Sequence, residues 1–192
     1  MIPVGYMAKK VVSRPDYINV DHVTDIYSVS GCISEDFADY IIYWKHNGYW
    51  FFDSADTIES VSTTEGIDLG DNTLFYYEVY EKQYNEDEKN WKSFEPENSF
   101  ETHVVEPTNK YLEGYDVVSF SGQTSAECSP LSCNHLAQEI QVNEHCLFKT
   151  FEEARSHLEK GDFKACEPGP YRIFAVYTVD NLLTNHSTRT AQ

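Results

Sequence analysis

The sequence has little positive charge and no long hydrophobic run. Its 14 lysine and arginine residues stand against 32 aspartate and glutamate residues, so the formal net charge is −18. An electric field of this sign repels phosphate backbones and anionic lipid, which argues against nucleic-acid binding and membrane association. No stretch approaches the roughly 20 apolar residues of a membrane span, and the N-terminus lacks the apolar core of a signal peptide. We therefore expect a cytoplasmic protein.

Cysteine is also scarce, and the motifs of common enzymes are missing. The five cysteines are an odd number without tight pairing, so reduced thiols are expected rather than a disulfide framework. The Ser-x-Ser-Gly segments at 28–31 and 119–122 lack the glycine and lysine spacing of phosphate-binding loops. No cofactor is predicted, and the sequence constrains the fold more than the function.

Three segments of the chain recur in the same order, which indicates an internal duplication. A repeated sequence indicates a repeated structural unit, so it is the first evidence to use when the architecture is predicted. We predict repeat units over about 24–94 and 115–180, joined by a linker over 95–111. The matching pairs are 25–34 with 116–125, 47–60 with 143–156, and 75–80 with 172–177.

Hydrophobic periodicity predicts the order β-α-β-α-β in each unit. Proline, glycine and capping residues predict where the helices begin and end. One of these signals is a capping box formed by Thr150 and Glu153. The expected fold is α+β, with the two tandem units packed as one domain over 1–192 around a mixed or mostly antiparallel sheet. Two separate lobes are the alternative. The expected helices are 34–47, 54–66 and 150–161, with a turn and short helix over 129–138. The expected strands are 25–30, 49–52, 74–80, 91–94, 102–105, 115–121, 145–148 and 170–177, with an edge strand within 1–20.

The densest group of reactive side chains lies between residues 128 and 146. One interpretation is a metal site, because thiolate and imidazole are zinc ligands. Another is a thiol enzyme in which Cys133 is the nucleophile, His135 or His145 is the base and Asn134 orients it. Core packing is the default, since cysteine is among the most buried residue types. The candidate metal ligands are Cys128, Cys133, His135, His145 and Cys146.

Aromatic and acidic residues alternate along a predicted hairpin near residue 85. Residues 35–101 contain 17 of the 32 carboxylates and four of the 14 cations, so this third of the chain carries −13 of the −18 charge. Aromatic anchors within an acidic rim suit the binding of a basic protein. The alternative is that Tyr76 and Tyr80 point into the core. The candidate partner-binding residues are Tyr76, Glu78, Tyr80, Glu81, Tyr84, Glu86, Asp87, Glu88 and Trp91.

Four sequence stretches in the first unit carry a resemblance to a known class of proteins. They are SVSG at 28–31, SEDFADYI at 34–41, DTIESVSTTEGIDL at 56–69 and LFYYEVY at 74–80. In this order they resemble small acidic immunity proteins of bacterial polymorphic toxin systems. The resemblance implies a non-enzymatic inhibitor that occludes a basic partner such as a toxin. The alternatives are a thiol enzyme or metal site centred on Cys133, and a small-molecule binder that uses a groove between the repeats.

Overall fold

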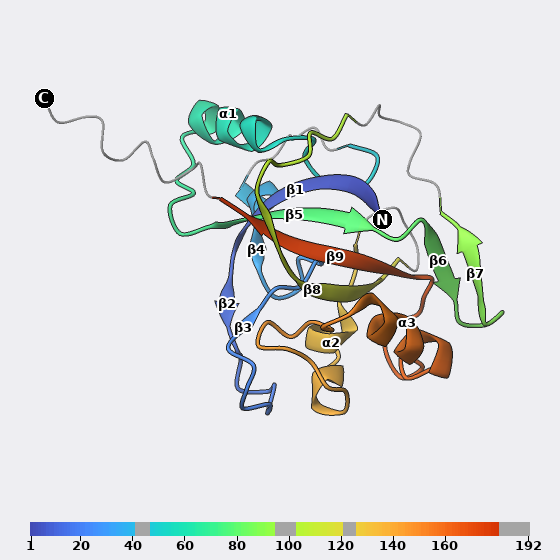
Figure 1. The fold of residues 1–192 in the computed structure, drawn as a ribbon. Helices are drawn as coiled ribbons and strands as arrows, with labels where there is room; N and C mark the ends of the chain where they lie inside the picture. Colours follow the sequence, from blue (N-terminus) through green and yellow to red (C-terminus); the bar gives the residue numbers. More distant parts are fainter. Residues whose placement is uncertain (41–46, 95–102, 121–125, 181–192) are drawn as a thin grey trace, which may run out of the picture.

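The structure, a computed structural model, describes residues 1–40, 47–94, 103–120 and 126–180. Within these residues the fold is built on an antiparallel sheet of seven strands, accompanied by a small sheet of two strands (Figure 1). The large sheet contains β1 (Ile2–Lys10), β4 (Glu35–Asp36), β5 (Thr73–Val79), β6 (Lys82–Asn85), β7 (Asn90–Ser93), β8 (Lys110–Ser119) and β9 (Tyr171–Val179). The small sheet pairs β2 (Val12–Ser13) with β3 (Asp25–Ile26).

Strand β9 is the centre of the large sheet. One of its edges pairs with β5 and then, through Tyr171 and Tyr84, with β6, while its other edge pairs with the whole of β8. Outside β5 come β1 and the short β4, and outside β6 comes β7. Every pairing is antiparallel. The prediction of an α+β fold with a mostly antiparallel sheet is therefore confirmed.

The helices are few and short. Two expected helices are confirmed with their caps, α1 (Ala55–Glu65) and α3 (Phe151–Lys160), and the turn and short helix expected over 129–138 are also found. The Ser54 side chain accepts from the Thr57 N–H, and Thr150 and Glu153 form the capping box at the start of α3. The remaining helical segments are α2 (Pro130–Cys133) and the 3-10 turns η1 (Phe37–Tyr40) and η2 (Leu136–Gln138). No helix in the described part of the chain is long and apolar enough to cross a membrane.

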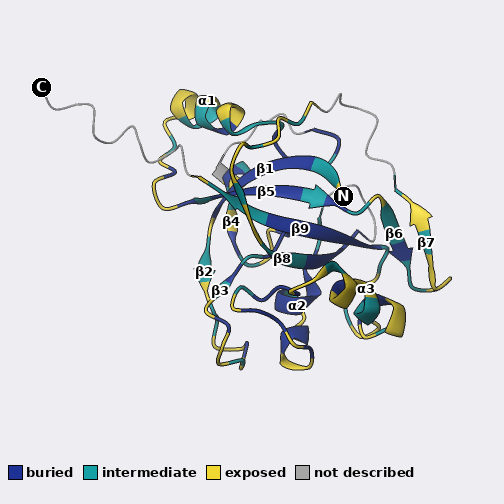
Figure 2. Ribbon diagram, viewed as in Figure 1, coloured by how far each residue is buried: buried dark blue, intermediate teal, exposed yellow. Residues whose placement is uncertain are grey.

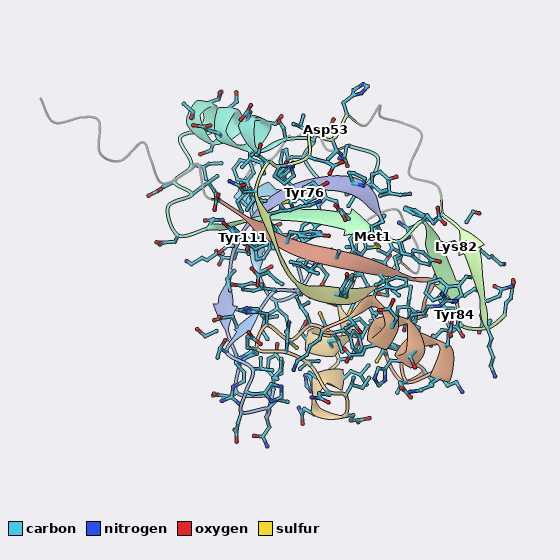
Figure 3. All side chains as sticks on the ribbon, in the orientation of Figure 1. Met1, Asp53, Tyr76, Lys82, Tyr84 and Tyr111 are labelled. Carbon is cyan, nitrogen blue, oxygen red and sulfur yellow. The ribbon has the colours of Figure 1, made fainter. Side chains whose placement is uncertain are left out.

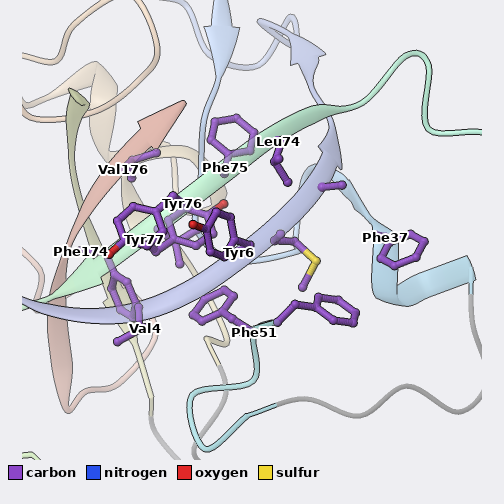
Figure 4. Close-up of a cluster of buried hydrophobic side chains, with 14 of the residues drawn as sticks. Val4, Tyr6, Phe37, Phe51, Leu74, Phe75, Tyr76, Tyr77, Phe174 and Val176 are labelled. Carbon is purple, nitrogen blue, oxygen red and sulfur yellow. The ribbon is translucent and has the colours of Figure 1, made fainter. Parts of the chain in front are cut away.

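Two hydrophobic clusters lie on the two faces of the sheet, as the alternation of side chains along a strand requires. On β9, Phe174 and Val176 belong to the first cluster, whereas Tyr171 and Ile173 belong to the second. The first cluster is rich in aromatic rings from β1, β5 and the loop before α1 (Figure 4). The second packs against α2 and α3, which lie beyond β8 (Figures 1 and 2). Each buried large side chain contributes roughly 1.5–3 kcal/mol to folding.

Two loops of the protein have the same construction. In each loop, the side-chain amide of one asparagine donates a hydrogen bond to the carbonyl oxygen of the residue before a strand glycine. Asn47 donates to Val4 at 2.9 Å, and Asn143 donates to Glu113 at 2.7 Å. The glycines follow directly, with positive φ angles of 126° at Gly5 and 154° at Gly114. The Oδ1 atoms accept from the N–H groups of Tyr49 and Phe51 in the first loop, and of His145 and Leu147 in the second.

Glycine is required in both strands because each loop passes very close to its backbone. A Cβ at Gly5 would lie 2.5 Å from the carbonyl oxygen of Phe52, and one at Gly114 would lie 2.6 Å from that of Phe148. The same two phenylalanines form isolated bridges with the residues after the glycines, Tyr6 and Tyr115. Residues 49–52 and 145–148 were predicted to be strands, and this is wrong, because their apolar side chains are buried by a turn rather than by strand pairing.

The predicted β-α-β-α-β order is not found. Each half of the chain has a strand, a helix and a strand: β1, α1, β5 in the first and β8, α3, β9 in the second. The sequence match of 25–34 with 116–125 does not join equivalent elements. Asp25 lies in the small sheet, whereas Asp116 lies inside β8. Residues 121–125 lie outside the described residues.

The helix expected over 34–47 is absent from its described residues. Its first residues pair with the end of β1, since Asp36 lies opposite Lys9, and only η1 follows. Sheet pairing therefore overrides the helical spacing of the apolar side chains. Residues 41–46, residues 95–102 of the linker and the predicted tail over 185–192 lie outside the described residues. The short strand expected over 102–105 is not formed by residues 103–105.

Candidate metal centre

Three cysteine side chains meet beside β8. The Sγ atoms of Cys32, Cys128 and Cys133 all lie within 4.8 Å of one another, and we call this group the three-sulfur cluster. Cys32 is exposed in the connection between β3 and β4, Cys128 is buried and bridges to Ser119, and Cys133 ends α2. Within the described ranges, no other group of three or more potential metal-ligating side chains is as close.

The second and third cysteines are positioned by local structure. Ser119 and Cys128 exchange backbone contacts that fix the segment after β8. Pro130 then begins α2, a position in which proline's fixed φ and missing N–H are favourable. The Cys133 N–H donates to the Ser129 carbonyl at 2.9 Å, which completes the turn. One helical turn therefore brings Cys133 back over Cys128.

Cys32 is brought to this turn by a buried lysine. Lys9, which is only 1% exposed, donates from Nζ to the carbonyl oxygens of Ser28 (2.9 Å), Val29 (2.7 Å) and Ser30 (3.2 Å). Its charge is paired with Asp36 at 3.2 Å. A buried ammonium group with this many acceptors is fully satisfied. The loop before Cys32 is therefore held firmly against β1.

A buried carboxylate joins the two cysteine-bearing segments. Asp116 Oδ2 accepts from the Val29 N–H at 2.8 Å and from the Ser129 hydroxyl at 2.6 Å. The Ser30 N–H donates to the Ser129 Oγ, and the Ser30 Oγ lies 3.8 Å from the Cys133 Sγ. Burial raises the pKa of Asp116 to about 6, although its hydrogen bonds act in the opposite direction. Asp116 is thus the positioning residue beneath the sulfur atoms.

The three thiols share hydrogen bonds in a way that favours one negative charge. Contacts from Cys128 and Cys133 lower the pKa of Cys32, and the same contacts raise the pKa of Cys128. The contact of Cys32 Sγ with the Glu127 carbonyl oxygen at 2.8 Å opposes this charge, because it holds a thiol proton. A Cys32 thiolate would be a metal ligand, and a bound cation would also favour the deprotonated forms of Cys128 and Cys133.

The two predicted histidines lie apart from the cluster. His135 stacks on Tyr17 with ring centroids 4.7 Å apart, and His145 stacks on Tyr27 at 4.0 Å. Neither ring belongs to the group of close ligand atoms, and neither does the buried Cys146. No hydrogen bond joins Cys133 to His135 or His145 in the described part of the chain, so the predicted pairing of Cys133 with either histidine stays a prediction.

The prediction found Cys128 and Cys133 but missed Cys32. A spacing of five residues within one turn is visible in the sequence, whereas Cys32 is distant from both along the chain. The repeat of Ser-x-Ser-Gly near Cys32 and near Cys128 was the available signal, and it was interpreted as turn chemistry alone. The three-sulfur cluster depends on long-range contacts, in which Asp116 joins the two segments and Lys9 holds the loop before Cys32.

The predicted partner-binding surface is divided between core and solvent. Tyr76 is 0% exposed, with its ring 5.0 Å from that of Tyr6, and Tyr84 is 3% exposed beside Trp91 (Figures 3 and 4). These two tyrosines are not surface anchors, because β5 is an inner strand and Tyr84 pairs with β9. The alternative that Tyr76 points inward is correct.

The other members of that surface differ in their exposure. The Glu78 carboxylate accepts hydrogen bonds from Lys110 and from the Tyr177 hydroxyl, so its charge is already paired within the protein. Tyr80, Glu86 and Trp91 are partly buried, and Glu81, Asp87 and Glu88 are exposed. Helix α3 adds cations beside the hairpin, and Arg155 lies over the Trp91 ring at 5.6 Å. The β6–β7 hairpin therefore has a mixed rather than a purely acidic surface.

A cavity of about 450 Å³ lies where the two halves of the chain meet. It is lined by Leu74 and by Val179, and the segment 105–109 passes along it. Three carboxylates, those of Asp56, Glu106 and Asp180, face it together with apolar groups. Such a lining suits a small cationic molecule better than an anionic one.

Comparison with known proteins found no match for this chain. No family model, no curated protein and no solved structure matches the chain.

Proposed function

We propose that this protein binds a thiophilic metal ion through Cys32, Cys128 and Cys133. The observation that carries the proposal is the convergence of three Sγ atoms within 4.8 Å from two segments far apart in the chain. Thiolates select soft or borderline ions such as Zn²⁺ and Cu⁺. Three cysteine ligands with one side open to solvent at Cys32 leave a coordination position for an exchangeable ligand.

The surroundings of the cluster support this proposal over simple packing. Three thiols in contact would lose little if apolar side chains replaced them, yet Lys9 and Asp116 hold the segments that present them with a buried polar network. Buried groups of this kind require complete hydrogen bonding, which restricts the position of the backbone. The net charge of −18 also favours the approach of a cation.

Metal uptake by the reduced full-length chain tests the proposal. With Zn²⁺ or Cd²⁺ in equilibrium dialysis, we expect one equivalent to bind and the thiolate absorption of Cd²⁺ to develop. Cys32→Ser, Cys128→Ser and Cys133→Ser should each weaken binding by more than about 100-fold, beyond the effect of removing an outer-shell partner. Cys166→Ser is the matched control and should bind as the parent does. No uptake by the reduced chain, or an equal loss in Cys166→Ser, overturns the proposal.

A second candidate is the immunity-type inhibitor, a non-enzymatic module that occludes a basic partner protein. The observation that favours it is the projection of the β6–β7 hairpin from the sheet, with Glu81, Asp87 and Glu88 exposed on it (Figure 1). Exposed carboxylates of this kind accelerate association with a basic protein. The partly buried Trp91 and Tyr80 would supply apolar contact beside them.

Charge reversal separates this candidate from the metal site. In co-purification with a panel of basic proteins, Glu81→Lys with Asp87→Lys should abolish a salt-sensitive complex. Asp56→Lys with Glu65→Lys, on the exposed side of α1, is the control and should retain the complex. If no basic protein binds, or if both pairs behave alike, the hairpin is not a docking surface.

A further inference from the structure

Arg172, in β9, is a buried cation that has no anionic partner among residues 1–40, 47–94, 103–120 and 126–180. The residue is 6% exposed, and its backbone pairs with Val118 in the middle of the sheet. Its side chain lies on the same sheet face as Phe174, where the first hydrophobic cluster is found. Arginine is almost never buried to this degree unless it is paired.

The guanidinium group is held by aromatic rings rather than by carboxylates. Its Cζ lies 3.2 Å from the centroid of the Phe94 ring and 3.9 Å from that of Phe120. A guanidinium group carries all five N–H donors in its own plane, so contact of its faces with aromatic rings leaves these donors free for acceptors.

Those donors are almost unused. Among the described residues, the side chain makes one long hydrogen bond, from Nη2 to the Gln83 Oε1 at 3.4 Å, and Nε is shielded from solvent without an acceptor. Burial lowers the pKa of Arg172 to about 9, which reflects the cost of holding this charge out of water. Lys9 is the contrast, because it is buried to the same degree and has four oxygen partners.

We propose that Arg172 is the recognition group of a binding site for an oxyanion, either a phosphate or a carboxylate group of a small ligand. Two parallel N–H donors in a fixed plane match the two oxygens of such a group. Phe94 and Phe120 hold the plane in place, and Tyr49, whose ring lies 5.8 Å from that of Phe94, adds an aromatic wall. The bound anion would supply the charge that the fold leaves unpaired. This site is independent of the three-sulfur cluster.

Thermal unfolding of the full-length chain tests the site, with inorganic phosphate, acetate and benzoate as separate probes. Each is compared with sodium chloride at the same ionic strength. We expect at least one anion to raise the unfolding midpoint in a saturable way, by roughly 3–10 °C when it is present at 10- to 100-fold its Kd. A shift with phosphate alone identifies a phosphate group as the ligand chemistry, and a shift with acetate or benzoate identifies a carboxylate.

Variants assign the shift to this side chain. Arg172→Met should abolish it, and Arg172→Lys should reduce it at least several-fold, because an ammonium group cannot donate two parallel bonds. Arg155→Met is the matched control, since Arg155 also lies over an aromatic ring but is exposed and paired with Glu159. If Arg172→Met fails to fold, Arg172→Lys alone decides between the outcomes. An anion shift that persists without Arg172, is lost equally in Arg155→Met, or never exceeds that of chloride overturns the proposal.

Discussion

The segment from β1 to β5 and the segment from β8 to β9 share one backbone arrangement but differ in the chemistry placed on it. In both, a strand glycine admits a loop organised by an asparagine, and a capped helix leads to an inner strand. Two residues after the glycine, the first segment has the apolar Met7 and the second has Asp116. The candidate metal centre lies where the second segment departs from the first, so the shared backbone arrangement does not by itself create the cluster.

The segments that connect each first strand to its asparagine loop also differ in their chemistry. The residues between β1 and Asn47 contribute Cys32, and those between β8 and Asn143 contribute Cys128 and Cys133. The loops around the asparagines contribute nothing to the cluster. An origin by duplication, with Gly5 aligned to Gly114, is our proposal for these similarities. The following predictions test whether the two segments are equivalent in energy as well as in geometry.

The largest effect is expected at the two strand glycines. Gly5→Ala and Gly114→Ala should each lower the free energy of unfolding by about 4 kcal/mol, because the new Cβ meets a carbonyl oxygen and the φ angle is one that side chains avoid. Urea denaturation measures the loss. Gly66→Ala is the control, since it has a positive φ but nothing within 4 Å, and about 1 kcal/mol is expected. Tolerance at only one strand glycine would show that the two loops are not equivalent.

A smaller effect, dependent on pH, is expected at the position that distinguishes the segments. The pKa of Asp116 is raised in the folded state, so its stabilising contribution is complete below the unfolded pKa of roughly 3.9 and is lost as the pH rises through about 6. Asp116→Asn removes the charge and keeps an acceptor. At pH 7.5 this variant should exceed the parent in stability by up to about 3 kcal/mol, and the two should converge only near pH 4, below the unfolded pKa.

Chemical denaturation of both proteins across pH 4–7.5 checks this prediction, because groups that titrate in both cancel in the difference. The groups that face the carboxylate are the Val29 N–H, the Ser129 hydroxyl and the charge of Lys9. A stability difference that does not change with pH would show that Asp116 stays ionised when buried, and the contrast with Met7 would then be one of shape alone.

The smallest effect is expected at the helix caps. Ser54→Ala and Thr150→Ala should each cost about 1 kcal/mol, and the loss at Thr150 should be the larger because its capping box contains a second hydrogen bond. Thr63→Ala, at an exposed position within α1, is the control and should change stability little. Equal losses at both caps would indicate that Glu153 adds nothing to α3.

Local physical chemistry allowed part of this fold to be predicted. The caps and glycine ends of α1 and α3, the strong strand around residues 171–177 and the antiparallel character of the sheet follow from short-range signals, which act through neighbours along the chain. The strand 74–80 was also correct, and the strand expected at 91–94 is found as β7. Its partner in the hairpin is β6 rather than β5, because β5 lies between β1 and β9.

The sequence by itself determined the charge, the helix ends and the two cysteines of one turn. The tertiary structure alone decided which distant groups meet: Cys32 with Cys128 and Cys133, Asp116 with Val29 and Ser129, and Arg172 with the rings of Phe94 and Phe120. The reason is that side-chain alternation and capping depend on neighbouring residues, whereas strand order depends on the burial of whole sheet faces. A sequence pattern therefore indicates side-chain alternation and capping, but it contains little information on strand order.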